Sequence, residues 1–481
     1  MTYSVSKYFK RFYTLLALLI VFHTSAISQI EVPAWIDSVG DKSSLKSDLV
    51  LNVNDFGARK NSLIQSTQAI QTAIDSCANA GGGKVVFDEG SYLTGAIYLK
   101  SNVHLQIGEG VELRGVIGVD DFPDIDTRVA GIEMRWPSAI INVLNQHNVL
   151  ISGKGTVHAQ GRYHWERYWK LRQEYTPKGL RWASDYDCKR VRTILVSESE
   201  NITLKDLTLK QAGFWTVHLL YSNQVTVDGI VIQNNIDGHG PSTDGIDIDS
   251  STKILIQNCD IDCNDDNFCL KAGRDADGIR VNRPTEYIVI KDCYSRKGGG
   301  LVTIGSETSG EIRHVYVTNL TANETNCAIR FKSAMTRGGG LSNIYISNIK
   351  MNNVKIPMEV TLNWNPSYSY ASLENYKGSV PDYWRVLLEE VPPSKGIPGF
   401  SDVYISNIKA TNAETAINVE GIKESYIENF NLQNINISGK NAGQIRFTKN
   451  WNLKNVQITS TNGKKLLMDN NVNFESSDSS F

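Results

Sequence analysis

The chain has 481 residues, of which 41% are hydrophobic and 21% are charged, so it can bury a large core and is not a disordered chain. Its formal net charge is −2, and the charge becomes −5 without residues 1–28, which carry three cations and no acid. This slightly acidic balance gives no support for nucleic-acid binding, so an acidic ligand would have to be held by local cations.

Residues 1–28 are predicted to be a signal peptide. Lys7, Lys10 and Arg11 precede an apolar run over 15–22, and small residues follow at 25–28. This order is typical of a secretory signal. The apolar run is too short to span a membrane, and no later segment is long and apolar enough. We therefore expect an exported protein, periplasmic or extracellular, with no membrane span.

The next predicted element is an amphipathic helix over 66–80. Ile70, Ile74 and Cys77 share one face of this helix, and glycines at 81–83 end it. A helix at this position suits a cap over the end of a stacked β structure, whose backbone edge would otherwise be free to pair.

Short alternating apolar segments then repeat along the chain. In each, a residue that is not aliphatic precedes an aliphatic-x-aliphatic triplet, and the triplets follow one another at intervals of 23, 29, 34, 27, 29 and 59 residues. A period between about 20 and 50 residues, with one strand-turn unit per repeat, predicts a β-solenoid. The triplets begin at Ile202, Val225, Ile254, Ile288, Val315, Ile344 and Val403.

These repeats predict an all-β fold, a right-handed single-stranded parallel β-helix over 29–475 with an N-terminal capping helix and a flexible tail over 476–481. The position five residues after each triplet start is always apolar, which predicts an inward-facing column. Cys259 and Cys293 fall in this column and are expected to be core residues. The seven cysteines fit no metal-binding spacing, and we expect no metal or cofactor.

Two insertions interrupt the repeat, at about 159–193 and 363–399. Both are rich in Tyr and Trp, and the first carries nine Lys and Arg residues against four Asp and Glu residues. Aromatic rings and cations together suit an acidic sugar, but a folded loop that buries its own aromatic residues is an equal interpretation.

Acidic and basic residues recur at intervals of about one coil in the second half of the repeats. Because these steps keep residues on one face, with neighbouring coils about 4.8 Å apart, they predict a groove of acids and cations. Two carboxylates can hydrolyse a glycosidic bond, and cations can hold an acidic sugar. A lone Asp would be assigned to a solenoid turn, but three acids with two cations favour a site. The residues are Asp244, Asp265, Asp266, Arg330 and Lys332.

At these residues the chain resembles the polygalacturonase family, glycoside hydrolase family 28. The family motifs Asn-Thr-Asp, Asp-Asp, Gly-His-Gly and Arg-Ile-Lys correspond in order to residues 242–244, 265–266, 298–300 and 330–332. The resemblance implies a right-handed parallel β-helix that hydrolyses α-linked galacturonic acid in pectin with inversion and without a metal. The expected partner is thus an acidic plant cell-wall polysaccharide or oligosaccharide.

The resemblance also implies residue roles. Asp265 would be the general acid, while Asp244 and Asp266 would orient and deprotonate the water. Arg330 and Lys332 would bind a galacturonate carboxylate, with Arg as a two-pronged donor and Lys as a point charge. Inversion needs room for a water molecule, so the opposed carboxyl groups should lie about 6.5 to 9.5 Å apart.

Two departures from the family motifs narrow the expected substrate. Ser242 stands in place of Asn, and Gly299 stands in place of His. Similar losses occur among relatives that act on rhamnogalacturonan. The segment 304–310 resembles the version found in exo-acting bacterial members. We therefore expect an exo-acting galacturonidase on rhamnogalacturonan-type fragments.

Other polar residues near the motifs are weaker candidates. Lys271 and Arg274 resemble family positions near the substrate, or they lie in a solvated turn. His239, in a Gly-His-Gly triplet before the first acid, could supply the missing imidazole, but a turn is the favoured interpretation. His218 is expected to be a core histidine rather than a sugar contact. Residues 247 and 249, both Asp, are expected to support turns.

Two other functional classes remain open from the sequence. A pectate lyase shares the β-helix and the acidic substrate, but it would need a calcium site and a base, and its unsaturated products absorb ultraviolet light. A non-catalytic polysaccharide-binding β-solenoid is the second alternative, because the motif histidine is missing.

Overall fold

The computed structural model describes residues 32–44, 47–374 and 376–481. The expected signal peptide lies outside the described residues, so it stays a prediction. Residues Ala34–Phe481 form one compact unit. Within the described ranges, every helix is too short or too polar to cross a membrane.

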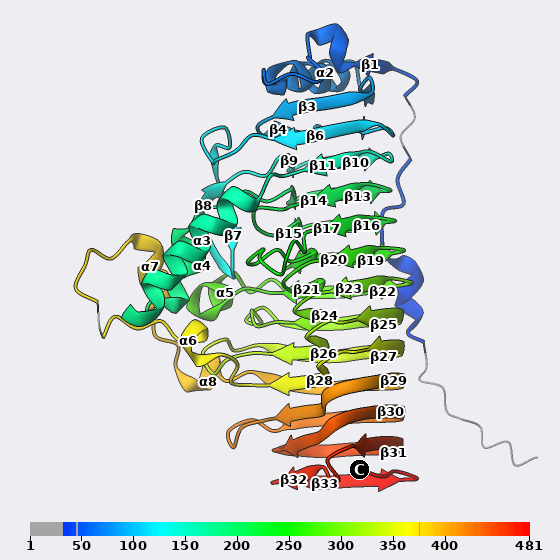
Figure 1. The fold of residues 1–481 in the computed structure, drawn as a ribbon, viewed down its shortest axis with the longest axis vertical. Helices are drawn as coiled ribbons and strands as arrows, with labels where there is room; N and C mark the ends of the chain where they lie inside the picture. Colours follow the sequence, from blue (N-terminus) through cyan, green and yellow to red (C-terminus); the bar gives the residue numbers. More distant parts are fainter. Residues whose placement is uncertain (1–31, 45–46, 375) are drawn as a thin grey trace, which may run out of the picture. The chain divides into compact units, whose positions relative to one another are not determined.

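This unit is a parallel β-helix in which successive coils stack on one another (Figure 1). The triplets found in the sequence are in register, because Ile202 pairs with Val225, which pairs with Ile254, and the column continues through the later coils to Val403. The all-β class and the parallel coils expected from the sequence are confirmed. Among the described strands, two form a separate antiparallel pair, and the others join the parallel system.

The strands of the coils form three stacks. The first stack contains β1 (Val50–Asn52), β2 (Gly83–Val86), β5 (Val103–Gln106), β10 (His147–Ser152), β13 (Glu200–Lys205), β16 (Asn223–Asp228), β19 (Thr252–Gln257), β22 (Thr285–Lys291), β25 (Ile312–Asn323), β27 (Gly340–Asn352), β29 (Gly399–Glu420), β30 (Ile427–Arg446), β31 (Thr448–Ser460) and β33 (Val472–Ser477). The last long strands continue around a corner into the neighbouring stacks.

The second and third stacks are shorter. The second contains β3 (Gly90–Thr94), β6 (Val111–Gly115), β11 (Thr156–His158), β14 (Thr208–Lys210), β17 (Val231–Gln233), β20 (Asp260–Asp262) and β23 (Tyr294–Lys297). The third contains β4 (Ile97–Tyr98), β9 (Ile141–Leu144), β12 (Ile194–Ser197), β15 (Val217–Leu220), β18 (Ile246–Asp249), β21 (Phe268–Lys271), β24 (Gly300–Ile304), β26 (Cys327–Lys332), β28 (Ile356–Thr361) and β32 (Leu467–Asp469).

A helix closes the first coil, as the sequence predicts. Helix α2 (Thr67–Asn79), preceded by η2 (Val53–Phe56), buries Ile70, Ile74 and Cys77 against the first strands. A second N-terminal element, η1 (Ala34–Ser38), packs Trp35 edge-on against Tyr287 on the outside of the first stack.

The interior of the coils is a continuous apolar column. All seven residues at the fifth position after the triplet starts are buried, including Cys259 and Cys293. The backbone amide of Cys259 lies 3.4 Å from the sulfur of Cys293. Burial raises the pKa of the Cys293 thiol well above its usual value. These two cysteines are core residues, as predicted. The seven residues are Leu207, Ile230, Cys259, Cys293, Leu320, Ile349 and Ile408.

Helical segments occupy both places where the sequence predicts insertions, and they gather on one side of the coils (Figure 1). Between β11 and β12 lie α3 (Arg162–Tyr175), η3 (Thr176–Lys178), η4 (Arg181–Ala183) and α4 (Ser184–Asp187). Between β28 and β29 lie α6 (Pro366–Ser369), α7 (Asp382–Leu387) and α8 (Pro393–Gly396). Sequence reasoning missed two further elements, the hairpin β7 (Asp124–Val129) with β8 (Ile132–Pro137), and α5 (Asp275–Val281).

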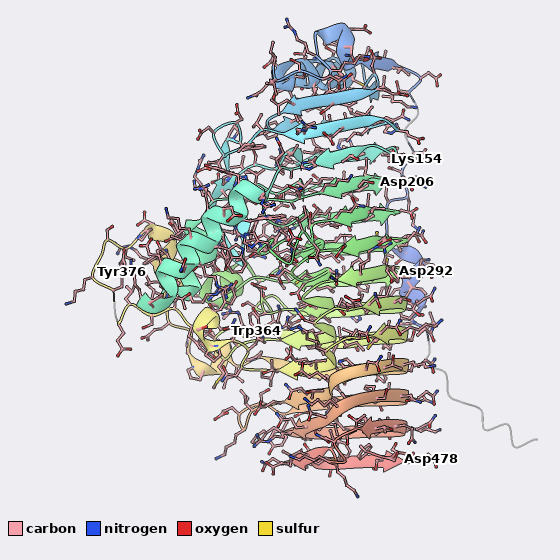
Figure 2. The ribbon with its side chains drawn as sticks, viewed as in Figure 1. Lys154, Asp206, Asp292, Trp364, Tyr376 and Asp478 are labelled. Atoms are coloured by element: carbon pink, nitrogen blue, oxygen red, sulfur yellow. The ribbon has the colours of Figure 1, made fainter. Side chains whose placement is uncertain are left out.

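The insertions share a second apolar core with this hairpin. Trp182 and Trp384, one from each insertion, meet at 4.9 Å between ring centroids, and Trp136 of β8 belongs to the same cluster. Figure 2 shows Trp364 where the second insertion meets the coils and Tyr376 at its far end. Most aromatic residues of the insertions therefore bury one another, which leaves a few for a ligand.

The C-terminal residues differ from the expected flexible tail over 476–481. Strand β33 runs to Ser477, and Ser480 forms a bridge with Gln457, with its amide donating to the carbonyl of Val456. These backbone hydrogen bonds extend the last coil to Ser480.

Asparagine residues form ladders at the turns between coils. Asn348, Asn407, Asn434 and Asn455 all have φ near +55°, the left-handed region that Asn tolerates better than most residues. From Asn407 on, each side-chain amide donates to the carboxamide oxygen of the previous Asn, at 3.1 Å for Asn407 to Asn348 and for Asn434 to Asn407. The ladder holds the turn conformation and the stacking of coils at once.

We expect Asn407→Ala to destabilise the β-helix by roughly 1–3 kcal/mol. The substitution removes two ladder hydrogen bonds, and it places alanine, whose side chain cannot form a hydrogen bond, in the left-handed region of φ. Asn407→Gly, which loses the same bonds without that strain, should cost about 1 kcal/mol less. Urea unfolding of the three proteins measures both values. Equal stability of the Ala and Gly variants would contradict the strain argument.

Candidate active site

The outer face of the third stack carries a band of polar side chains. Asp247 of β18 pairs in register with Cys269 of β21, and farther along the stack Thr303 pairs with Arg330, which pairs with Glu359. Gly299 does not stack on Arg330, because Gly300 pairs with Cys327 and Arg330 lies three residues later. Arg330 reaches the acids through the length of its side chain rather than through its position in the turn.

A pocket with a cavity volume of about 80 Å³ lies over this band, and the insertions and the β7–β8 turn wall it. Five residues predicted from the sequence, Asp244, Asp265, Asp266, Lys271 and Lys332, all line it. The other lining residues are Ala130, Arg181, Asp185, Phe214, Trp215, Ser242, Ser306, Glu307, Trp364 and Tyr368.

The three predicted acids are closer together than expected. Carboxylate oxygens of Asp244, Asp265 and Asp266 lie within 4.8 Å of one another. The separation of about 6.5 to 9.5 Å expected for an inverting pair is therefore wrong for this structure. Its cause is the fold, because neighbouring coils are only about 4.8 Å apart and two of the acids are adjacent in sequence.

Closely spaced acids could also hold a cation. By spacing alone, Asp244, Asp265 and Asp266 form one such group, and Asp244, Asp247 and Cys269 form another. The ammonium of Lys271 lies 3.7 Å from Asp244 and 3.5 Å from Asp247, so a protein cation already balances part of this charge.

Asp266 is held as a carboxylate. Burial alone would raise its pKa, but Lys332 at 2.8 Å and Arg330 at 3.6 Å outweigh burial and hold the pKa well below its usual value. Asp266 is therefore ionised at neutral and at moderately acidic pH.

Asp265 has the opposite tendency. Burial and the neighbouring carboxylate of Asp266 raise its pKa, although Lys332, Lys271 and Arg330 act against them. The pKa values of two adjacent carboxyl groups are thus shifted in opposite directions, which favours the protonated form of Asp265 and the ionised form of Asp266. Such a difference is the usual mark of an acid and a base in one site.

Asp244 and Asp247 form a second, deeper pair. Burial is the main cause that raises the pKa of both groups, to about 8 for Asp247. Neither oxygen of Asp247 has a hydrogen-bond partner among the described residues, and its side chain is fully buried. In the ligand-free protein this pair therefore holds a proton at neutral pH, so Asp244 is less ready than Asp266 to act as a base.

Lys271 lies at the centre of the buried charges. Besides Asp244 and Asp247 it contacts Glu307 at 3.6 Å, and its ammonium lies 4.9 Å from the ring of Trp215. Only 6% of its side chain is exposed. The alternative of a solvated turn is thus wrong, whereas the predicted position at the substrate pocket agrees with the lining, and three carboxylates already balance the Lys271 charge.

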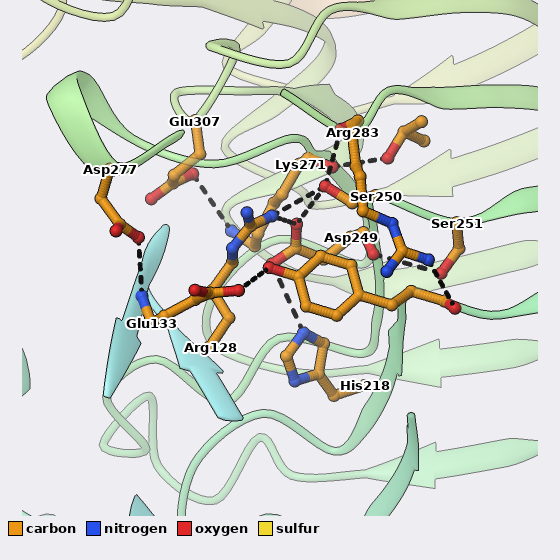
Figure 3. Close-up of polar contacts among 12 residues, drawn as sticks. Arg128, Glu133, His218, Asp249, Ser250, Ser251, Lys271, Asp277, Arg283 and Glu307 are labelled. Atoms are coloured by element: carbon orange, nitrogen blue, oxygen red, sulfur yellow. Dashed lines mark hydrogen bonds and ion pairs between the residues drawn. The ribbon is translucent and has the colours of Figure 1, made fainter. Parts of the chain in front are cut away.

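Behind the pocket, buried ion pairs attach the β7–β8 hairpin to the third stack (Figure 3). Arg128 donates to Asp249 at 2.8 Å, with both side chains fully buried, and its guanidinium lies over the ring of Tyr221. His218 beside them is also fully buried, and burial lowers its pKa to about 4. His218 is a core histidine, as expected, whereas Asp249 anchors the hairpin rather than a turn.

Two predicted substrate-binding residues lie elsewhere. Arg274 is completely buried and donates to Asp275, Tyr186 and the carbonyl of Tyr368, so it joins the two insertions, and its predicted substrate contact is corrected. His239 lies outside the pocket lining, where its ring faces Glu166 of α3 at 3.1 Å. It fixes a turn to the first insertion, which is the interpretation favoured by the sequence.

The two motif departures lie beside the acids. A Cβ atom at Gly299 would be 3.1 Å from the backbone of Asp265 and 3.2 Å from a carboxylate oxygen of Asp266. The Ser242 hydroxyl donates to Asp185 of the first insertion at 3.0 Å. The motifs predicted that Ser242 and Gly299 lie near the acids, but they gave no indication that Ser242 binds Asp185.

Sequence reasoning missed the residues that the insertions bring to the pocket. Arg181 and Asp185 are four residues apart in the first insertion, and Trp364 and Tyr368 are four apart in the second. The excess of cations and aromatic residues in these segments was the available signal. It could not say which of them face the ligand, because both segments also have a core of their own.

A β-helix with acids of divergent pKa, lysines and aromatic residues in one pocket defines a class of protein, the carbohydrate-cleaving hydrolases. The comparison with known families agrees. Residues 77–374 match the family described as "Glycosyl hydrolases family 28". The chain therefore belongs to family 28 of the glycosyl hydrolases, and it is a polygalacturonase-like enzyme.

Among curated proteins, the chain is 29% identical over 400 residues to a "Probable polygalacturonase" of Vitis vinifera, covering 76% of this chain and 77% of that protein. It is 25% identical over 435 residues to an "Exo-poly-alpha-D-galacturonosidase" of Dickeya chrysanthemi, covering 81% and 67%. The crystal structure of an exopolygalacturonase from Thermotoga maritima has a TM-score of 0.71 over 90% of this chain and 94% of that chain, at 24% identity, and supports the fold.

We expect Asp247→Asn to stabilise the protein at pH 7 by roughly 1–3 kcal/mol. The pKa of Asp247 is about 8 in the folded protein, whereas the ordinary pKa of an Asp carboxyl group is 3.8, so the unfolded chain releases this proton at lower pH. The folded wild-type protein therefore loses stability as the pH rises from about 4 to 8. Asp247→Asn has no carboxyl group at this position and does not lose that stability.

Thermal unfolding at pH 5 and pH 8 measures this difference, with the exposed Asp237→Asn as a matched control. The advantage of Asp247→Asn over wild type should be larger at pH 8 than at pH 5. An advantage that does not change with pH would contradict the assignment of a buried proton.

Proposed function

We propose that this enzyme hydrolyses the α-linkage of galacturonic acid at the end of a pectic chain, with inversion, and that rhamnogalacturonan-type fragments are its preferred substrates. The observation that carries the proposal is the pair Asp265 and Asp266, in which one pKa is raised and the other is held low inside a pocket that also contains lysines. The substrate class follows from membership of the family and from these cations.

In the proposed mechanism, Asp265 protonates the glycosidic oxygen as the bond to the anomeric carbon breaks. Asp266, already ionised, accepts a proton from the attacking water, and Asp244 orients that water. Lys332 and Arg330 keep Asp266 ionised for this step. The short distance between the acids is closer to that of retaining enzymes, so the anomeric outcome is a direct test of inversion.

The end-specific action rests on the walls of the pocket. Coils alone form an open face, whereas here Asp185 of the first insertion and Trp364 and Tyr368 of the second line the site. A closed end admits the terminus of a chain better than its middle. The printed name of the Dickeya chrysanthemi relative, an exo-poly-alpha-D-galacturonosidase, supports the same proposal.

The preference for rhamnogalacturonan-type fragments rests on the two motif departures. Gly299 places no side chain against the acids, and the hydroxyl of Ser242 is engaged by Asp185. Both remove contacts that the resembled family motif would make with a plain galacturonan. Export to the periplasm or the medium, where such polymers are met, is part of the proposal and rests on the signal-like residues 1–28.

The proposal is tested by the products formed from defined homogalacturonan and rhamnogalacturonan oligosaccharides. We expect free galacturonic acid as the first product, new reducing ends, no ultraviolet-absorbing unsaturated ring, and a faster reaction on the rhamnogalacturonan series. Proton NMR of the first-formed anomer checks inversion. Unsaturated products would instead identify a lyase, and mixed internal oligosaccharides would contradict end-specific action.

Asp265→Asn should lower kcat by at least about 100-fold, because general acid catalysis contributes roughly 100- to 10,000-fold. The exposed Asp237→Asn serves as the matched control and should retain wild-type turnover. Initial rates on the best oligosaccharide from the product screen measure both. Full activity of Asp265→Asn would contradict the role of Asp265 as general acid, whereas absence of turnover by the wild type on every oligosaccharide would leave the binding solenoid as the better interpretation.

The pH profile of kcat/KM provides a separate prediction. The rate should fall as the pH rises through the raised pKa of Asp265, and it should hold at acidic pH because Asp266 stays ionised. Lys332→Met should move the acidic limb upward by roughly 1–3 pH units, since an opposite charge lowers a neighbouring pKa by that amount. The exposed Lys350→Met is the control and should leave both limbs in place.

A further inference from the structure

The first insertion brings one cation into the pocket. Arg181 of η4 lines the cavity, and its guanidinium lies 5.0 Å from the ring centroid of Tyr368, which belongs to the second insertion. About 15% of its side chain is exposed. Arg181 therefore lies where the two insertions meet, away from the strands that carry the acids.

The other two lining cations are already matched by acids. Lys332 donates to Asp266 at 2.8 Å, and Lys271 is surrounded by three carboxylates at 3.5 to 3.7 Å. These lysines serve mainly to balance the catalytic acids. Arg330 lies outside the pocket lining and donates to Glu359 at 2.9 Å.

Arg181 has donors to spare. One of its terminal nitrogens donates to Asp185 at 3.0 Å, its Nε is buried without a partner, and the second terminal nitrogen makes no hydrogen bond among the described residues. Asp185 does not neutralise it fully, because the same carboxylate also accepts from the completely buried Arg190 at 2.8 Å and from Ser242 at 3.0 Å. Two guanidinium groups share one carboxylate, so these three groups together carry a net positive charge.

We propose that Arg181 is a specificity-determining residue that binds the carboxylate of the terminal uronic acid unit held in the pocket. This inference rests on the proposed function and identifies which sugar group is recognised and by which side chain. Guanidinium and carboxylate form strong paired hydrogen bonds, and a neutral sugar would leave a buried cation without a partner. The ring of Trp364, 5.7 Å from the ring of Tyr368, lines the same pocket and offers a face for the sugar ring.

Two variants and one control test the proposal. Arg181→Gln removes the charge, Arg181→Lys keeps it without the paired donors, and Lys170→Gln removes an exposed cation of the same insertion. The substrates are a galacturonate trisaccharide and the same trisaccharide with its non-reducing terminal carboxyl methyl-esterified. Thermal unfolding of each variant checks that the insertion remains folded.

For Arg181→Gln we expect kcat/KM on the free acid to fall roughly 10- to 100-fold, mainly through KM, because a hydrogen bond to a charged group contributes about 1.5–3 kcal/mol. The rate on the methyl ester should stay within about twofold. Arg181→Lys should recover part of the loss, and Lys170→Gln should match wild type. Equal losses on both substrates, or no loss on the acid, would overturn the inference.

Calorimetry separates this inference from the proposed function. In the Asp265→Asn background, galacturonate should bind more tightly than galactose, and adding Arg181→Gln should abolish the difference. If that difference persists, the role of Arg181 is wrong although hydrolysis stands. If the wild type hydrolyses no galacturonan while Arg181 still selects galacturonate over galactose, the proposed hydrolysis is wrong and the recognition by Arg181 stands.

Discussion

The constraint on which this site depends is the spacing of parallel coils. Hydrogen bonding fixes neighbouring coils about 4.8 Å apart, so outward side chains of successive coils lie close together even when they carry the same charge. In the third stack this brings Asp244, Asp247, Asp265 and Asp266 together. Carboxylates at this distance cannot all be ionised in a buried site, and the result is a set of unequal acids.

Neighbouring cations determine which of these carboxyl groups is ionised and which is protonated. Lys332 and Arg330 approach Asp266 and keep it ionised, whereas Lys271 is divided among three carboxylates and leaves Asp247 mostly protonated. The same geometry that costs stability thereby separates an acid from a base within one pocket. Active sites commonly contain such strained electrostatics, offset by the stability of the surrounding scaffold.

The insertions convert an open face into a pocket, and they do so as a folded unit. Their tryptophans bury one another, and Arg274 and the pair Arg128 and Asp249 fasten the insertions and the hairpin to the coils through fully buried side chains. A buried ion pair of this kind is costly to break because either partner left alone is an unpaired charge. The walls can then hold Arg181 and Trp364 at fixed positions over the acids.

Sequence reasoning found much of the site because its signals are local. Asp265 with Asp266 and the Arg-x-Lys pair are short motifs at coil spacing, and all but Arg330 among the predicted acids and first-choice cations line the pocket. The errors came from side-chain direction. Arg274 follows the acid strand closely, yet its side chain turns away into the insertions, and Asp247 was assigned to a turn although it lies buried beneath the acids.

By itself, the sequence determined the parallel coils, the capping helix and the acid motifs, because apolar periodicity and turn residues act over a few neighbours and repeat at every coil. Only the tertiary structure decided the distances between the acids, which of them holds a proton, and which insertion residues face the pocket. Those properties depend on burial and on charges from segments far apart in the chain, such as Asp266 with Lys332 and Arg181 with Tyr368.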